Sequence, residues 1–315
     1  VVRHTILGCA LKKARAPWPK KLSDGLGLSV AIVAFTLVAS AGVLMQGCTG
    51  ERSGPVEAVE SEAGGPEVDY RAGLQALSQG NQTQGVQRLE KAAEAGHAQA
   101  MLKLGDIRNA DAGDANGDAA IAWYGKAANV GNIEAARKLG IAHATGLGRN
   151  EPDPAKALPP LETAAKAGDA EAQLHLGQVL IVLKRYEEAI TWLTRAGGAG
   201  QARAWYLLGE MYYQQQTVKQ DIEKAFGYYG KGAEAGNDEA QLMYSFFYLT
   251  GRGTRKDKAE AYKWALIADE ASSPKSRGAL KFLEPKLSDA DKTEGKARAE
   301  AWRAANPTKV PKLAK

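Results

Sequence analysis

The feature that most constrains this chain is a glycine that follows an Ala-rich run and recurs every 32 to 37 residues. An alanine comes four positions after each copy, and four of the five copies continue with a Leu-Gly pair at positions eight and nine. Self-similarity at this period is typical of solenoids built from stacked helix pairs. The five recurring glycines are Gly96, Gly131, Gly168, Gly200 and Gly236.

Differences in repeat length fall in one connection only. The spacing from the Leu-Gly glycine to the small residue that begins the next block varies from 12 to 17 residues. In contrast, that small residue always lies 11 positions before the recurring glycine, and the Leu-Gly glycine always lies 9 positions after it. Small and apolar residues recur within the blocks at a helical period, as at Ala204, Leu208 and Tyr212. We therefore expect one tight and one variable turn per helix pair. Pro159-Pro160 falls inside a second helix and predicts a kink or a shortened helix there.

The repeats resemble the Sel-1-like repeat, a tetratricopeptide-like repeat with an extended loop. Residues 204–236 (AWYLLGEMYYQQQTVKQDIEKAFGYYGKGAEAG) and 251–264 carry the resemblance, and Gly146-Leu147-Gly148 repeats the loop. The 32-residue copy, with Lys184 to Ile190, is more similar to an ordinary tetratricopeptide repeat. The resemblance covers about residues 70 to 272 and implies a scaffold that binds partner molecules.

The predicted fold is all-α, a right-handed α-solenoid of about six helix pairs over residues 69–272. Residues 273–305 are expected to form C-terminal capping helices, because a solenoid needs its open end covered. Residues 306–315 are expected to be a disordered tail. Residues 48–68 contain Gly, Pro, Ser and Glu without an apolar period, which predicts a flexible linker. Residues 1–47 are expected to be a signal peptide or signal anchor.

The leader combines basic residues with an uncharged stretch from residue 25 to 50, whose apolar centre runs from Leu26 to Met45. This is the pattern of an export signal, and it is also long enough to cross a bilayer of about 30 Å. Gly47-Cys48 resembles the lipobox of bacterial lipoproteins, which implies that Cys48 is the lipid attachment site. Cleavage after Ala39-Ser40-Ala41 and an uncleaved inner-membrane anchor remain as alternatives. All three place the body in the bacterial cell envelope, facing the periplasm.

The charge of the chain is concentrated in that leader. The sequence has 41 Lys and Arg against 36 Asp and Glu, but residues 1–47 hold six of the bases and one of the acids. The rest is neutral, which makes nucleic acid an unlikely partner and disfavours an acidic polysaccharide. Cys9 and Cys48 are the two cysteines, so the body can hold neither an intrachain disulfide nor a cysteine metal cluster.

No arrangement of residues in the repeats suggests catalysis. His97, His143 and His175 fall on ordinary repeat positions, and no metal-binding histidine pair or serine elbow occurs. The acidic segment 111–118 does not follow the order of a calcium loop and is expected to be a solvated loop. The segments 146–148 and 251–253 are expected to be turns that join two helices. We therefore expect no enzyme activity, no cofactor and no metal.

Aromatic residues are dense in the last two repeats, where a groove could bind a partner. If the stack resembles tetratricopeptide arrays, defined positions of each first helix line its concave face. An aromatic groove with few charges suits an extended peptide or a partner helix, although packing between repeats could absorb Tyr213 and Phe246. The candidate groove residues are Arg137, Arg203, Tyr206, Glu210, Tyr213 and Phe246.

The expected function is therefore that of a non-enzymatic, envelope-anchored scaffold that binds a protein or peptide partner. The alternative is a regulatory or accessory subunit of an envelope enzyme or of a polysaccharide-secretion complex. These two possibilities differ in what the partner does, and the repeats themselves select neither.

Overall fold

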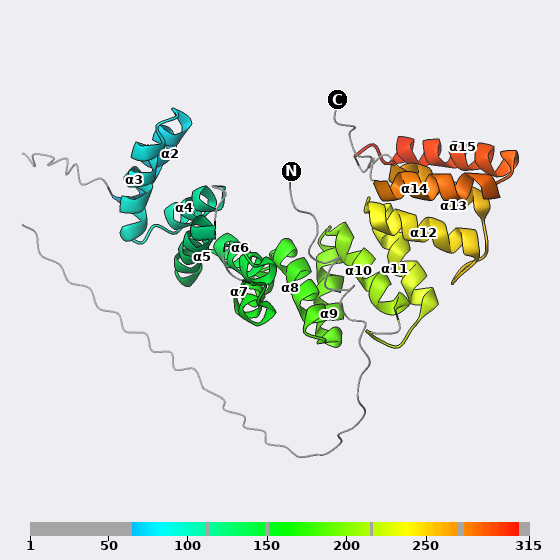
Figure 1. Ribbon diagram of the computed structural model, residues 1–315, viewed down its shortest axis with the longest axis horizontal. Helices are drawn as coiled ribbons and strands as arrows, with labels where there is room; N and C mark the ends of the chain where they lie inside the picture. The colour runs from blue at the N-terminus through cyan, green and yellow to red at the C-terminus, as the bar shows by residue number, and fades with distance from the viewer. Residues whose placement is uncertain (1–64, 111–113, 149–150, 215–216, 270–273, 309–315) are drawn as a thin grey trace, which may run out of the picture. The chain divides into compact units, whose positions relative to one another are not determined.

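A computed structural model describes residues 65–110, 114–148, 151–214, 217–269 and 274–308 (Figure 1). These residues form α-helices and one short 3-10 helix, with no strand among them. The expected signal segment 1–47 and most of the expected linker 48–68 lie outside the described residues. The first helix begins at Pro66, so the last three residues of the expected linker are helical. Proline at the first helical position and the acids Glu67 and Asp69 in the first turn favour that start.

The helices between residues 66 and 269 follow one another in pairs, and each packs against the next in chain order, whereas the last helix, residues 289–305, packs mainly against residues 258–269. The first members, here called A helices, are α2 (Pro66–Ser78), α4 (Ala98–Ala110), α6 (Ile133–Thr145), α8 (Ala170–Val182), α10 (Ala202–Tyr213) and α12 (Asp238–Thr250). The second members, here called B helices, are α3 (Gln82–Glu94), α5 (Asp114–Asn129), α7 (Pro154–Lys166), α9 (Tyr186–Gly198), α11 (Ile222–Glu234) and α13 (Lys258–Asp269). Two further helices follow, α14 (Pro274–Leu283) and α15 (Asp289–Ala305). The 3-10 helix η1 (Glu284–Lys286) follows α14. The predicted α-solenoid is confirmed.

The tight turn between pairs is built in the same way along the stack. Each of the five recurring glycines has a φ between 88° and 94°, the left-handed conformation that glycine adopts without strain after a helix. At three of these turns the next residue is Asn or Asp, and its side chain accepts the backbone N–H of the conserved alanine at 2.8 Å, as Asn132 does from Ala135. This capped turn explains why the spacing from glycine to alanine is constant.

The glycine of the Leu-Gly pair lets the two helices of a repeat approach closely. A Cβ added at Gly177 would lie 2.5 Å from the Leu193 side chain, and one added at Gly209 would lie 2.6 Å from the Tyr229 ring. Leu193 and Tyr229 are fully buried. The side chain of the B helix therefore fills the space that the glycine leaves on the A helix.

The prolines at 159 and 160 do not shorten α7, so that alternative is wrong. Helix α7 spans 13 residues, as do α6 and α8. The two carbonyls that lose a backbone N–H partner belong to Ala155 and Lys156, which are exposed and can be hydrated. The Thr163 hydroxyl also donates to the Pro159 carbonyl at 3.0 Å.

The acidic segment 111–118 is only partly described, and its described part is not a loop. Residues 114–118 form the first turns of α5, which corrects the expectation. Gly117 lies against the backbone of Gly148 in the α6–α7 loop, where a Cβ would clash. This tertiary contact holds the first turns of α5 against that loop. Gly146 and Gly251, each with a positive φ, end α6 and α12, so the predicted turns there are confirmed.

Candidate protein-binding surface

Side chains of successive A helices meet directly on one side of the stack, here called the A-helix face. Helix α6 contacts α8 and helix α10 contacts α12. Arg137 of α6 pairs with Glu171 of α8, and Arg203 of α10 pairs with Glu239 of α12. The six predicted groove residues all belong to α6, α10 or α12.

The two predicted arginines have different surroundings. Arg137 has a side chain that is only 17% exposed, and its guanidinium lies within ion-pair distance of Glu134, Asp169 and Glu171. Its charge therefore links neighbouring repeats. The Arg203 side chain is 45% exposed and lies 3.4 Å from Glu239. Its partner Glu239 is less exposed, at 24%, so Arg203 keeps an accessible guanidinium while it balances the charge of a half-buried carboxylate.

Glu210 is committed to interactions within its own repeat. Its carboxylate accepts hydrogen bonds at 2.6 Å from the Tyr229 hydroxyl and from the Gln214 amide. Burial, together with the charge and hydrogen bond of Glu210, raises the pKa of Tyr229. Burial followed by the charges of Glu210 and Glu239 also raises the pKa of Tyr206. Both phenols therefore stay protonated at neutral pH, and Glu210 serves packing.

Tyr206, Tyr213 and Phe246 gather around one aromatic core formed by Tyr229 and Phe247. The Tyr213 ring lies 5.4 Å from the Phe247 ring and 6.5 Å from the Tyr229 ring, measured between centroids. Phe246 lies 6.3 Å from Phe247. The three outer rings are partly buried, so each keeps some surface in contact with solvent. We call Tyr206, Tyr213 and Phe246 the aromatic patch; Arg137 lies outside it.

Arg252 adds a charge to the aromatic patch that the sequence did not reveal. Its guanidinium donates to the Tyr213 hydroxyl at 2.7 Å and lies 5.9 Å from the centre of the Phe246 ring. In the sequence, Arg252 belongs to the predicted turn 251–253, and nothing else there marks it as a binding residue. Its contact with Tyr213 joins residues 39 positions apart, and a spacing that crosses a whole repeat leaves no local signal.

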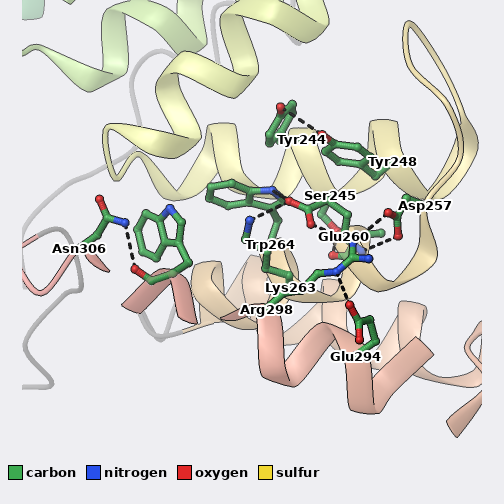
Figure 2. A network of polar contacts seen from close by, with 12 residues as sticks. Tyr244, Ser245, Tyr248, Asp257, Glu260, Lys263, Trp264, Glu294, Arg298 and Asn306 are labelled. Carbon is green, nitrogen blue, oxygen red and sulfur yellow. Dashed lines mark hydrogen bonds and ion pairs between the residues drawn. The ribbon is translucent and has the colours of Figure 1, made fainter. Parts of the chain in front are cut away.

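A second polar cluster holds the C-terminal cap in place (Figure 2). Arg298 of α15 donates to Asp257 at 2.9 Å, to Glu260 at 3.2 Å and to Glu294 at 2.9 Å. The Trp264 indole also donates to Glu260, at 2.9 Å. Burial raises the pKa of Asp257, but the backbone N–H of Glu260 and the Arg298 charge outweigh it and lower that pKa. This network attaches α15 to α13.

Among the described histidines, His97 serves packing and capping. The His97 ring stacks on Tyr70 at 4.5 Å, its Nδ1 accepts the Ala100 N–H at 3.1 Å, and its Nε2 lies 2.9 Å from Glu67. Burial lowers the pKa of His143 and of His175. Across the described ranges no three His, Cys, Asp or Glu side chains group as a metal site. None of the described helices combines the length and the apolar character needed to cross a membrane.

Comparison with known proteins gives the family. The Sel1 repeat model matches five segments, residues 70–97, 98–132, 133–169, 202–237 and 238–268. A tetratricopeptide repeat model matches residues 152–201, which contain the 32-residue copy. The tetratricopeptide repeat model thus matches the copy with the shortest variable connection, and the Sel1 repeat model matches the copies on either side of it.

The chain is similar to several proteins in sequence and in structure. An uncharacterized protein of Neisseria meningitidis serogroup B is 30% identical over 200 residues, which is 62% of this chain and 41% of that protein. The chitin synthase regulator SKT5 of Saccharomyces cerevisiae is 30% identical over 124 residues, 38% of this chain and 18% of that protein. This chain therefore spans less than half the length of these curated relatives.

Two solved structures share the fold. The antigen c5321 of uropathogenic Escherichia coli, described as an SLR fold, superposes with a TM-score of 0.64 at 23% identity over 79% of this chain and 57% of that chain. A Sel1 repeat protein from Oxalobacter formigenes superposes with a TM-score of 0.53 at 28% identity over 70% of this chain and 66% of that chain. With family matches over more than half of its length, the chain belongs to the Sel1 repeat family.

Proposed function

We propose that this Sel1 repeat protein is a non-enzymatic scaffold that binds a polypeptide partner on the A-helix face, centred on the aromatic patch. The observation that carries the proposal is the gathering of three partly exposed rings from α10 and α12 around one buried aromatic core. Aromatic anchors of this kind supply much of the binding energy of protein interfaces. Repeat solenoids present extended surfaces of this type to their partners.

The polar groups around the aromatic patch favour an apolar contact with a limited charged rim. Glu210 is satisfied by Tyr229 and Gln214, and the Tyr213 hydroxyl is satisfied by Arg252. Of the two predicted arginines, Arg203 is the more accessible, with a side chain that is 45% exposed against 17% for Arg137. A partner helix that presents apolar side chains and one acidic residue fits this arrangement.

The experiment is affinity capture with the full chain and with the double variant Tyr206→Ala/Phe246→Ala. We expect the variant to weaken partner binding by at least about tenfold, because truncating an interface anchor costs about 2 kcal/mol or more. Val130→Ala is the matched control, since Val130 is 52% exposed in the turn before α6 and outside the aromatic patch. Equal capture by wild type and double variant would refute this surface.

Membrane attachment at the cell envelope is the second part of the proposal. It is supported by the uncharged segment up to residue 50 and by Gly47-Cys48, and the flexible linker expected after it would carry the repeats away from the membrane. Mass spectrometry of the mature N-terminus tests it. A diacylated or triacylated Cys48 is the expected result, and an unmodified Cys48 within an intact chain would contradict lipid attachment.

A regulatory subunit of an enzyme complex is the second candidate. It is supported by the 30% identity to a yeast protein whose name is chitin synthase regulator, although the match covers 38% of this chain. The two candidates are separated by identifying the captured partner and assaying it with and without this protein. A change in the partner's turnover favours the regulatory role, and unchanged turnover favours a scaffold.

A further inference from the structure

A hollow of about 610 Å³ lies between the α12–α13 loop and the start of α15, and no residue of the aromatic patch lines it. It is lined by Tyr248 and by Arg255, Lys256 and Lys258 from the loop and the first turn of α13. Two carboxylates, Asp257 and Asp291, complete its charged lining. Three cations against two anions give the lining a net charge of +1.

Both carboxylates of this hollow are already committed. Asp257 accepts the Glu260 backbone N–H at 2.9 Å and the Arg298 guanidinium at 2.9 Å. Asp291 accepts the Ser288 backbone N–H at 2.9 Å and the Ser288 hydroxyl at 2.7 Å, which forms the cap of α15. Asp257 is thus paired with Arg298, whereas Asp291 is hydrogen-bonded to uncharged groups and keeps its charge near Lys258.

Two of the cations have no partner. Arg255 and Lys256 are exposed, and within the described residues their side chains make no ion pair or hydrogen bond. Lys258, in contrast, donates to the Lys286 carbonyl at 2.8 Å. Thr254 adds a hydroxyl group to the lining, whereas the Tyr248 hydroxyl already donates to that of Tyr244 at 3.4 Å. The polar groups left unused around the hollow are mainly hydrogen-bond donors, which fits an anion and not a cation.

The charge of this loop distinguishes it from the equivalent loops of other repeats. Residues 251–257 (GRGTRKD) contain three bases and one acid. The loop before α7, residues 146–153 (GLGRNEPD), contains one base and two acids, and the segment 217–221 before α11 (TVKQD) contains one of each. The basic loop is thus a feature of the last full repeat and does not follow from the repeat pattern.

We propose that this hollow binds a carboxylate of an acidic segment in a partner polypeptide, with Arg255 and Lys256 as the main contacts. The two cations without a partner among the described residues, Arg255 and Lys256, match the two oxygens of a single carboxylate. One local site without a basic stripe along successive repeats also does not suit a nucleic acid, which needs many phosphate contacts. The inference rests on the proposed function insofar as the anion is carried by a polypeptide.

The test is fluorescence anisotropy of a labelled oligoglutamate peptide with the full chain at low ionic strength. We expect Arg255→Gln/Lys256→Gln to weaken binding about tenfold, because two charge-assisted contacts are lost. Lys219→Gln, in the equivalent loop before α11, is the matched control and should leave binding unchanged. Circular dichroism checks that both variants fold.

Three results would overturn the proposal. Equal binding to wild type and to Arg255→Gln/Lys256→Gln would remove the site, and equal binding of an oligoglutamine peptide would remove the role of charge. Displacement of the peptide by inorganic phosphate at much lower concentration than by free glutamate would make it a phosphate site. Since the probe is a defined peptide, failure here leaves the capture experiment on Tyr206 and Phe246 unaffected.

Discussion

In the repeat of α8 and α9, Leu193 packs against Gly177, whereas in the repeat of α10 and α11 Tyr229 packs against Gly209. The residue after the glycine differs as well. It is Gln178 in the first repeat and Glu210 in the second, and Glu210 accepts a hydrogen bond from the Tyr229 hydroxyl at 2.6 Å. The aromatic ring thus reaches past the glycine to an acid that the aliphatic repeat does not have.

The same relation holds in two further repeats. In α4 and α5, Tyr124 packs against Gly105 and its hydroxyl donates to Asp106 at 3.0 Å. In α6 and α7, Leu161 packs against Gly140, and the next residue is an isoleucine. The glycine therefore sets how closely the helices approach, while the residue after it is matched to the polarity of the side chain across the interface.

The largest expected effect comes from removing the aromatic ring. Tyr229→Ala should lower the free energy of unfolding by about 3 to 5 kcal/mol, because it opens a cavity in the core. Tyr229→Phe should cost about 1.5 to 3 kcal/mol, the value of a hydrogen bond to a charged group. Denaturant unfolding followed by circular dichroism measures both. If the two variants cost the same, the hydrogen bond and not the ring holds this repeat together.

Filling the glycine position should have the next largest effect. Gly209→Ala places a methyl group against the Tyr229 ring and should destabilise the protein by about 1 to 3 kcal/mol. Gly227→Ala is the matched control, because Gly227 is exposed in α11 and has no atom within 4 Å of the added Cβ. There the gain in helix propensity should stabilise by about 0.5 to 1 kcal/mol. Thermal unfolding of both variants measures the difference. A stabilising effect of Gly209→Ala would contradict the close contact between Gly209 and the Tyr229 ring.

Alkaline pH should lower the free energy of unfolding through the buried tyrosines of the aromatic repeats, and the aliphatic repeats should not contribute. Burial raises the pKa of Tyr229, Tyr206 and Tyr244 in the folded state. Above about pH 10 the unfolded chain loses protons that the folded chain keeps, so the free energy of unfolding falls as pH rises. The largest slope is about 1.4 kcal/mol per pH unit for each tyrosine.

Urea unfolding at a series of pH values from 8 to 11 measures this slope. Tyr229→Phe should make it smaller, because one raised pKa is removed. Leu193→Val, in the aliphatic repeat, should lower the overall stability and leave the slope unchanged. A slope that does not respond to Tyr229→Phe would place the titrating groups elsewhere.

The smallest effects are expected at the ion pairs between A helices. Arg137→Gln should cost about 1 kcal/mol, since the arginine is largely buried among three carboxylates. Arg203→Gln should cost about 0.5 kcal/mol, since the arginine is 45% exposed and pairs with one carboxylate among the described residues, that of Glu239. Chemical denaturation of the two variants gives the comparison. A larger cost at Arg203 would mean that it supports the fold and is not free for a partner.

Most of the fold could be predicted from the sequence because the repeat spacing reports the turns. Gly131 and Asn132 show why, since the glycine's left-handed φ and the asparagine cap both act within a few residues of the chain. The start of α5 could not be predicted in this way. It depends on Gly117 meeting Gly148 of the next loop, a contact between segments that no local pattern encodes.

The candidate surface could be predicted in position but not in chemistry. The repeat alignment placed Tyr206, Tyr213 and Phe246 on A helices, where the structure also has them. The pairing of Arg137 with three acids and of Glu210 with Tyr229 depends on which side chains meet between stacked helices. The number of charged residues in the sequence therefore overstates how many charges are available to a partner.

Hydrogen–deuterium exchange of the full chain with and without its captured partner tests the central claim most directly. The account predicts slower exchange on α10 and α12, where the aromatic patch lies, and unchanged exchange on α7 and α9. Protection confined to B helices, or no protection of α10 and α12, would contradict a partner-binding role for the A-helix face.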